Sequence, residues 1–253
     1  MANFVPVNKE AHQNLKVASK RDLSHVADQH LIPVSAREYA QAATSYPIAL
    51  VKDPEGDRYR SIAMLGFENG ENLYYEKDKW NAVYIPQSIS QVPFGLGLDP
   101  EKEKTLTACI DTDSQFVGED KEHAIYDADG KETEFYQKVQ ENLGRLYDNE
   151  VMTEKFIDEM VKHDLLLELE LNMQLASGET KKLKGLFGID EKKLQTLSDE
   201  TVLDFHKRGL FIPIHAMLGS VGQLNRLAQL RNQSENPAKV AGVGFSVATE
   251  EQK

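Results

Sequence analysis

The sequence has only one cysteine, which excludes a disulfide bond within the chain. Cys109 lies in the apolar run 106–110, a setting typical of a buried thiol. A catalytic thiol needs a base and positive charge close by, and the adjacent sequence offers neither. We therefore predict that Cys109 is part of the core.

Positive charge is also scarce. The chain has 29 basic residues against 41 acidic ones, for a formal net charge of −12. Such a surface repels the phosphates of nucleic acids and of anionic membranes. We therefore expect neither a nucleic acid nor a membrane as partner, and instead a protein, a peptide or a small molecule.

Long apolar runs are missing as well. No stretch approaches the ~20 apolar residues that a membrane-spanning helix needs, and the first residues lack the basic and apolar regions of a signal peptide. The 40% hydrophobic and 28% charged residues are typical of a globular protein. We expect a soluble protein of the cytoplasm.

The common motifs of catalysis and cofactor binding are absent too. The sequence contains neither a phosphate-binding loop nor a dinucleotide fingerprint. Ser114 and Ser220 do not lie in a nucleophile-elbow sequence. We therefore expect no cofactor, and no motif identifies the catalytic residues of an enzyme.

The pattern that is present changes between the two halves of the chain. Short apolar segments separated by turn residues fill the first half, which predicts a mostly antiparallel β-meander. The second half has helical spacing at 132–146, an alternating strand at 165–175 with a hairpin partner at 181–187, and a long C-terminal helix with an apolar stripe over 214–230. Asp190 and Ser198 are predicted to cap short helices, the second of which ends at Gly209. The fold class is therefore α+β.

The length of 253 residues suits one elaborated domain over residues 1–232. Two subdomains, 1–130 and 131–232, are the alternative. Residues 233–253 are small, polar and without periodicity, so we predict a disordered tail there.

The acidic stretch from Asp111 to His123 has part of the spacing of a calcium-binding loop. Its sixth position, however, is Phe116, where the turn of such a loop requires glycine, and its flanks have strand character rather than helical character. We predict a solvated acidic loop and no metal site.

His206, Asp111 and Ser114 are the candidate catalytic residues. An imidazole can act as acid or base beside a carboxylate and a hydroxyl, provided that the fold brings the three into one cleft. The alternative for His206 is a residue at a helix end that bonds to backbone carbonyls.

Trp80, Tyr84, Gln91 and Phe94 are the candidate ligand-binding residues. The rings of Trp80, Tyr84 and Phe94 offer contact area, with polar tips on the first two. Two prolines restrict the segment and so lower the entropy lost on binding. The uncharged Gln91 suits a neutral or zwitterionic ligand. Two alternatives stay open: the rings belong to the core, or the segment 80–94 joins copies of the chain in a homo-oligomer.

The order and spacing of many short motifs resemble the SapC family over roughly residues 3–230. The motifs are Tyr46-Pro47-Ile48, Ala63-Met64-Leu65-Gly66, Asn72-Leu73-Tyr74, Trp80, Tyr84-Ile85-Pro86, Pro93-Phe94, Cys109-Ile110-Asp111, Ile125-Tyr126-Asp127, Asp129-Gly130 and Leu186-Phe187-Gly188-Ile189-Asp190-Glu191. Relatives often carry basic residues before the Pro-Phe pair, where this chain has Ser90-Gln91-Val92. An anion that binds there in the family should therefore bind weakly here.

The resemblance implies no particular reaction. The family is named after a surface-layer protein locus and is distinct from a peptide-transport permease of the same name, and its genes often lie beside those of TonB-dependent receptors. It therefore implies a binding or adaptor protein linked to surface-protein production or TonB-dependent uptake. An enzyme acting on a peptide or amino acid is the alternative.

Overall fold

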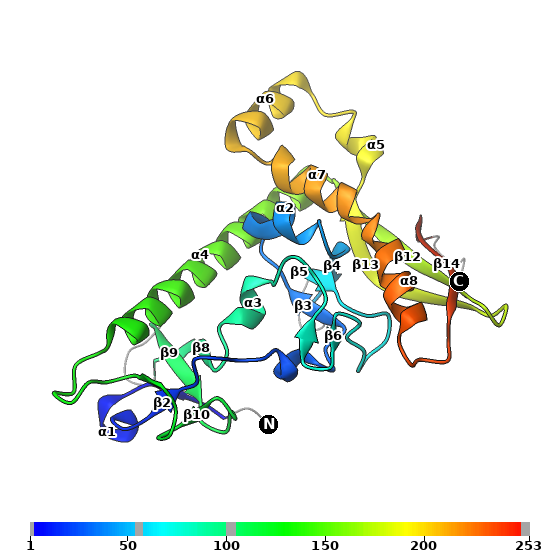
Figure 1. Ribbon diagram of the computed structural model, residues 1–253. Helices are drawn as coiled ribbons and strands as arrows, with labels where there is room; N and C mark the ends of the chain where they lie inside the picture. Colours follow the sequence, from blue (N-terminus) through cyan, green and yellow to red (C-terminus); the bar gives the residue numbers. More distant parts are fainter. Residues whose placement is uncertain (1–2, 54–57, 100–104, 249–253) are drawn as a thin grey trace. The chain divides into compact units, whose positions relative to one another are not determined.

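The structure is a computed structural model that describes residues 3–53, 58–99 and 105–248 (Figure 1). The chain divides into two compact units. Unit 1 comprises Met1–Leu23 and Gln87–Asp148, and unit 2 comprises Ser24–Pro86 and Asn149–Lys253. This division differs from the expected single domain and from the alternative boundary at residue 130. Each unit joins segments that are distant in the sequence, and such long-range pairing leaves no local signal.

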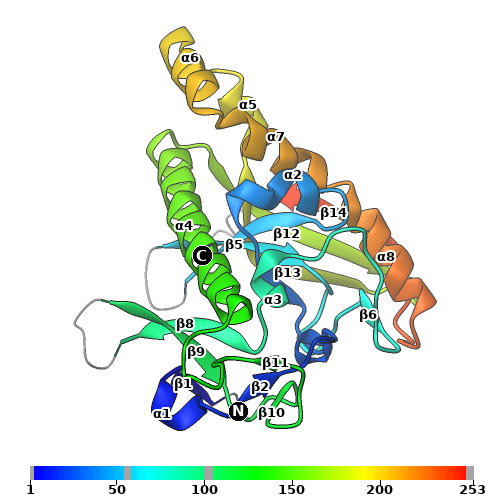
Figure 2. The same ribbon diagram turned by 60° about the vertical axis from the view of Figure 1, so that its left-hand side comes forward.

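Unit 1 contains two small sheets with the strand orders β1-β9-β8 and β10-β2-β11. Figure 2 shows β1, β9 and β8 side by side. The elements are β1 (Phe4–Pro6), α1 (Lys9–His12), β2 (Lys16–Val17), α3 (Gln87–Ser90), β8 (Phe94–Leu98), β9 (Leu106–Asp111), β10 (Val117–Gly118), β11 (His123–Ala124) and α4 (Glu134–Lys162). Helix α4 begins in unit 1 and ends in unit 2.

The core of unit 1 forms where the apolar side of α4 packs on residues of both sheets. Its buried members are Val17, Phe94, Ala108, Ile110, Ile125, Tyr126, Tyr136, Val139 and Leu143. The helical members recur three or four residues apart, as an amphipathic helix requires. Cys109 is also buried, as predicted, and burial raises the pKa of its thiol.

Unit 2 is built on a six-stranded sheet with the order β14-β12-β13-β4-β5-β3. Its strands are β3 (Leu31–Pro33), β4 (Ile48–Lys52), β5 (Tyr59–Met64), β12 (Leu166–Leu175), β13 (Thr180–Ile189) and β14 (Val240–Val247), with a separate pair β6 (Tyr75–Glu76) and β7 (Lys79–Trp80). Its helices are η1 (Ser24–Val26), η2 (Ala36–Glu38), α2 (Tyr39–Ala42), α5 (Glu191–Leu194), α6 (Asp199–Arg208), α7 (Phe211–Ser220) and α8 (Gln223–Gln233).

All pairings between the described strands are antiparallel, which confirms the α+β class. The predicted hairpin is present as β12 and β13. Alternation places Leu171, Met173 and Leu175 on the buried face of β12, while Glu168 and Gln174 are exposed on the other face. Glu170 breaks the pattern because it is buried and forms an ion pair with Lys182 at 2.7 Å.

The C-terminal part differs from the predicted disordered tail. Residues 240–247 form β14, which pairs with β12 along most of that strand, whereas 249–253 lie outside the described residues. The strand alternates apolar residues with glycine and serine, and its pairing with β12 places the apolar ones on the buried face of the sheet.

The helices before this strand match the prediction. The Ser198 hydroxyl accepts a bond from the Thr201 amide, and α6 ends at Gly209, whose φ of 70° favours glycine. Helices α7 and α8 follow one another as the expected long C-terminal helical segment and lie along the sheet (Figure 1). No helix within the described residues is long and apolar enough to cross a membrane.

Candidate functional site

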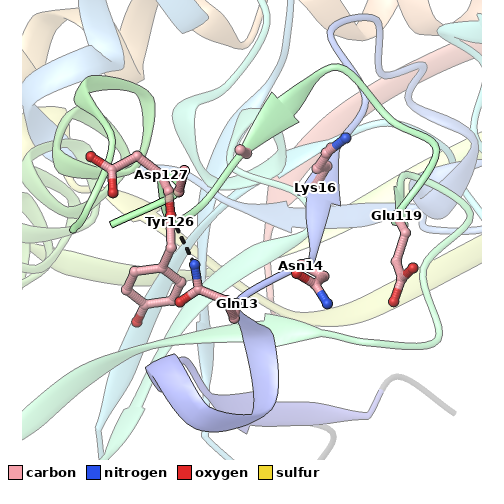
Figure 3. A pocket seen from close by; sticks show the side chains of 8 residues that line it. Gln13, Asn14, Lys16, Glu119, Tyr126 and Asp127 are labelled. Carbon is pink, nitrogen blue, oxygen red and sulfur yellow. Dashed lines mark hydrogen bonds between the residues drawn. The ribbon is translucent and has the colours of Figure 1, made fainter. Parts of the chain in front are cut away.

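A hollow with a cavity volume of about 340 Å³ lies in unit 1 beside β2 (Figure 3). Its lining residues are Gln13, Asn14, Lys16, Glu119, Ala124, Tyr126, Asp127 and Ala128. Strand β2 is the centre of its sheet and pairs through Lys16 with both Gly118 and Ala124. The chain segments that leave β10 and β11 are thereby held on either side of Lys16.

A rigid turn forms one wall of the hollow. The Asp127 carboxylate accepts bonds from the backbone amides of Asp129 and Lys131, both at 2.9 Å, and Gly130 has a φ of 73°. The side-chain amide of Gln13 donates to the Asp127 carbonyl at 2.8 Å (Figure 3). The turn is therefore tied to the segment that enters β2.

Other polar groups of the hollow are left for water or a ligand. Among the described residues, the Lys16 amine, the Glu119 carboxylate, the Asn14 amide and the Tyr126 hydroxyl have no hydrogen-bond or ion-pair partner. In the view of Figure 3, Lys16 and Glu119 lie on one side of Asn14, and Tyr126 lies on the other. Burial, and then the charge of Glu132, raise the pKa of Tyr126, so its hydroxyl stays a neutral donor at neutral pH.

The chemistry of this hollow is that of recognition. An amine can bind a carboxylate, a carboxylate can bind an ammonium group, and an amide with a hydroxyl can bind uncharged polar atoms. The described residues include no group of three or more His, Cys, Asp or Glu side chains placed to hold a metal ion. The predictions of no metal and no cofactor stay predictions.

The structure brings Trp80 and Tyr84 together in unit 2. The Trp80 indole donates to the Tyr46 hydroxyl at 2.8 Å, and Tyr46 in turn donates to the Tyr84 carbonyl. The Tyr84 hydroxyl donates to the buried carboxylate of Glu38 at 2.6 Å. Trp80 also stacks on Tyr74 with ring centroids 6.1 Å apart. Both polar tips are thus used inside the protein.

Gln91 and Phe94, the other candidate ligand-binding residues, belong to unit 1. Phe94 is 4% exposed and forms part of the core described above. The Gln91 amide donates to the Ser90 hydroxyl at 3.0 Å. The predicted site segment therefore runs from one unit into the other at residue 87.

The candidate catalytic residues are divided between the units. Asp111 and Ser114 share a turn of unit 1, where the Asp111 carboxylate accepts from the Asn3 amide at 2.8 Å and the Ser114 hydroxyl accepts from the Phe116 amide at 3.3 Å. His206 lies exposed on α6 of unit 2, and its carbonyl accepts from the Gly209 amide. The side chains of Asp111 and Ser114 thus support local structure in unit 1, whereas His206 takes part in local structure through its backbone.

Sequence reasoning missed the residues of the hollow. Tyr126, Asp127 and the turn at Gly130 occur among the family-like motifs, but they were not assigned to a site. Lys16 and Glu119 lie far apart in the chain; Lys16 belongs to no motif, and Glu119 belongs to the acidic stretch 111–123, which was considered only as a metal-binding loop. Only the pairing of β2 with β10, in which Lys16 is opposite Gly118, brings Lys16 close to Glu119.

The fold is of the mixed α+β class, and unit 1 carries a hollow lined mostly by polar residues. The chain belongs to the SapC family, because the family model described as SapC matches residues 7–227. Comparison with curated proteins gave no match, and comparison with solved structures gave none either.

Proposed function

We propose that this SapC-family protein is a binding protein that takes a small zwitterionic ligand, an amino acid or a dipeptide, in the hollow of unit 1. One observation carries the proposal: Lys16 and Glu119, whose amine and carboxylate have no partner in the described part of the chain, line the same hollow. An amino acid carries an ammonium group and a carboxylate on one carbon, and these charges are complementary to those of the two side chains. The Asn14 amide and the Tyr126 hydroxyl supply the uncharged contacts.

The amine of Lys16 stands on a flexible four-carbon stem and can turn toward a ligand carboxylate. The hollow is open to water, so each charge contact contributes little, on the order of 1 kcal/mol or less. We therefore expect dissociation constants between about 10 μM and about 1 mM. Such affinities suit a protein that senses or hands on an abundant metabolite.

The cellular setting is a further part of the proposal. We assign the protein to the cytoplasm, as an adaptor linked to surface-protein production or TonB-dependent uptake. An enzyme has less support, because the side chains of Asp111 and Ser114 accept bonds from backbone amides of their own turn and its surroundings.

The test is calorimetry with leucine and the dipeptide Leu-Leu, together with N-acetylated and C-amidated forms of each. The parent compounds should bind, and either blocked form should bind up to about fivefold more weakly, because one charge contact of about 1 kcal/mol is lost. The Lys16→Gln variant should lose the preference for a free carboxylate. Lys20→Gln is the matched control, since Lys20 is an exposed lysine of unit 1 outside the hollow.

Two results would contradict the proposal. One is equal binding of the zwitterionic and blocked compounds by the unaltered protein. The other is a Lys16→Gln variant with the same affinities as Lys20→Gln.

A further inference from the structure

Strand β14 ends the six-stranded sheet of unit 2 with a long, open edge (Figure 1). Its eight residues, Val-Ala-Gly-Val-Gly-Phe-Ser-Val, include no proline and no charge. The strand at the opposite end, β3, has three residues and ends in Pro33. Proteins usually protect sheet edges with short strands, prolines or charges, because an open edge can pair with another strand. The β3 edge is protected in this way, and the β14 edge is not.

The register identifies the backbone groups that face outward from β14. The Ala248 amide donates to the Glu168 carbonyl at 3.0 Å, and Val247 is opposite Leu169. Hydrogen-bonded and non-bonded pairs alternate along an antiparallel ladder. The backbone groups of Val243, Phe245 and Val247 therefore point away from β12, and no strand within the described residues pairs with them.

The open edge has a defined start. The Asn232 side chain accepts from the Val240 amide and donates to the Val240 carbonyl, both at 2.7 Å. The irregularity between Gln174 and Leu175 lies at the same end of the strand. A partner strand therefore meets the part of the edge from Val243 to Val247, which is centred on Phe245.

The side chains along this edge continue an apolar layer. Val243 is opposite Met173, and Phe245 is opposite Leu171, so both lie on the buried face of the sheet. Val243 and Phe245 are half-buried, and Val247 is 65% exposed. The other face of the strand carries small residues, Gly242, Gly244 and Ser246.

We propose that β14 pairs with β14 of a second copy of this chain, antiparallel and with Phe245 on the two-fold axis, so that two sheets join into one. This register uses all three outward-facing residues of each copy, with Val243 opposite Val247 and Phe245 opposite Phe245. Aromatic and β-branched pairs of this kind stabilise antiparallel strands. The symmetry is closed, so association stops at a dimer.

The apolar pattern favours a second copy in this orientation. Antiparallel pairing about Phe245 places the half-buried Val243 of one copy opposite the exposed Val247 of the other, so each copy covers an apolar side chain that the other leaves open. The proposal does not depend on the hollow of unit 1, and β14 lies beyond the residues that the family model matches.

The test uses the register of the solvent face, where Gly244 of one copy is opposite Ser246 of the other. A side chain at Gly244 meets no atom within 4 Å. Ser246 is exposed, and its replacement removes, in every variant alike, the hydrogen bond that its hydroxyl accepts from the Asn172 side chain at 2.8 Å. In the variant Gly244→Lys/Ser246→Lys, like charges meet across the dimer. In the matched variant Gly244→Lys/Ser246→Glu, opposite charges meet.

The measurement is sedimentation velocity of the full chain over a range of concentrations. The unaltered protein and the Lys/Glu variant should sediment as dimers, at twice the chain mass of 28.5 kDa, and the Lys/Lys variant as a monomer. Mixing the Lys/Lys variant with Gly244→Glu/Ser246→Glu should restore the dimer. Fluorescence of Trp80, the single tryptophan, verifies that unit 2 stays folded in every variant.

Three results would overturn the proposal. An unaltered protein that is monomeric at all concentrations shows that this edge does not join two copies, and that any partner strand comes from another protein. A Lys/Lys variant that stays dimeric places the interface elsewhere. A mixture that stays monomeric excludes this register.

Discussion

The polar side chains around Trp80 in unit 2 and those around the hollow in unit 1 differ in how far they are paired. In unit 2 the indole, phenols and carboxylate around Trp80 bond to one another, and the buried Arg231 binds Glu71 at 2.6 Å. In unit 1 the charged groups around the hollow of Lys16 have no partner in the described residues. Internal pairing stabilises a fold, whereas unpaired groups in a hollow are available to a ligand. The difference is the basis for proposing the ligand site in unit 1 rather than around Trp80.

The largest effect should come from Leu171→Asp in unit 2. Leu171 is fully buried, and β12 has neighbouring strands on both sides. A carboxylate without a partner there costs several kcal/mol, comparable with the whole stability of a domain, about 5–15 kcal/mol. Folded protein should not be recovered on expression. Gln174→Asp, on the exposed face of the same strand, should change the free energy of unfolding by less than about 1 kcal/mol.

The next effect concerns the ion pair of Arg231 and Glu71. Arg231 is fully buried, so Arg231→Met leaves the Glu71 carboxylate without its cation and should cost about 3–5 kcal/mol in urea denaturation followed by Trp80 fluorescence. The double variant Arg231→Met/Glu71→Gln should be more stable than the single one, because no unpaired charge remains. A double variant that is less stable would show that the charge of Glu71 is not the cause.

Tyr84→Phe distinguishes an internal polar network from a ligand site. The change removes the hydrogen bond to the buried Glu38, which should cost about 1.5–3 kcal/mol. Tyr75→Phe is the control, because the Tyr75 hydroxyl bonds to Asp78 at an exposed position and should contribute less than about 1 kcal/mol. Equal small losses in both variants would indicate that Tyr84 is available for binding.

The free energy of unfolding of unit 2 should also depend on pH. Hydrogen bonding to Arg208 at 3.0 Å lowers the pKa of Glu159 below its ordinary value of 4.5. A lowered pKa stabilises the folded state above the ordinary value, and this contribution is lost as the pH falls through the lowered value. Glu159→Gln should remove this pH-dependent contribution to the free energy of unfolding, which is at most about 1 kcal/mol. Unfolding free energies measured from pH 6 down to about pH 3 should therefore fall less steeply in the variant.

The smallest effect on stability should come from Lys16→Gln in unit 1. Within the described part of the chain its amine has no partner to lose, so the free energy of unfolding, measured by thermal melting with circular dichroism, should change by less than about 0.5 kcal/mol. The same variant should lose the ligand preference described above. A large loss of stability would place Lys16 with the structural residues and remove the contrast between the units.

Local elements could be predicted from the sequence because their signals are local. The alternation at 165–175 gave β12, and Ser198 with Gly209 gave the ends of α6. The residues of β14 were predicted to be disordered. In the structure they form a strand because they pair with β12, which is distant in the sequence. Trp80 and Tyr84 were chosen as ligand contacts because their tips are polar, and the sequence does not reveal that those tips bond to Tyr46 and Glu38.

By itself the sequence determined the family, the α+β class and the elements whose periodicity or capping lies within a few residues. The tertiary structure decided which distant segments share a unit, that Lys16 and Glu119 line one hollow, and that β14 forms an open edge. The physical reason is the distance along the chain over which each interaction acts. Capping and amphipathic spacing act between neighbours in the chain, whereas strand pairing and the grouping of charges depend on contacts between residues that the chain itself holds far apart.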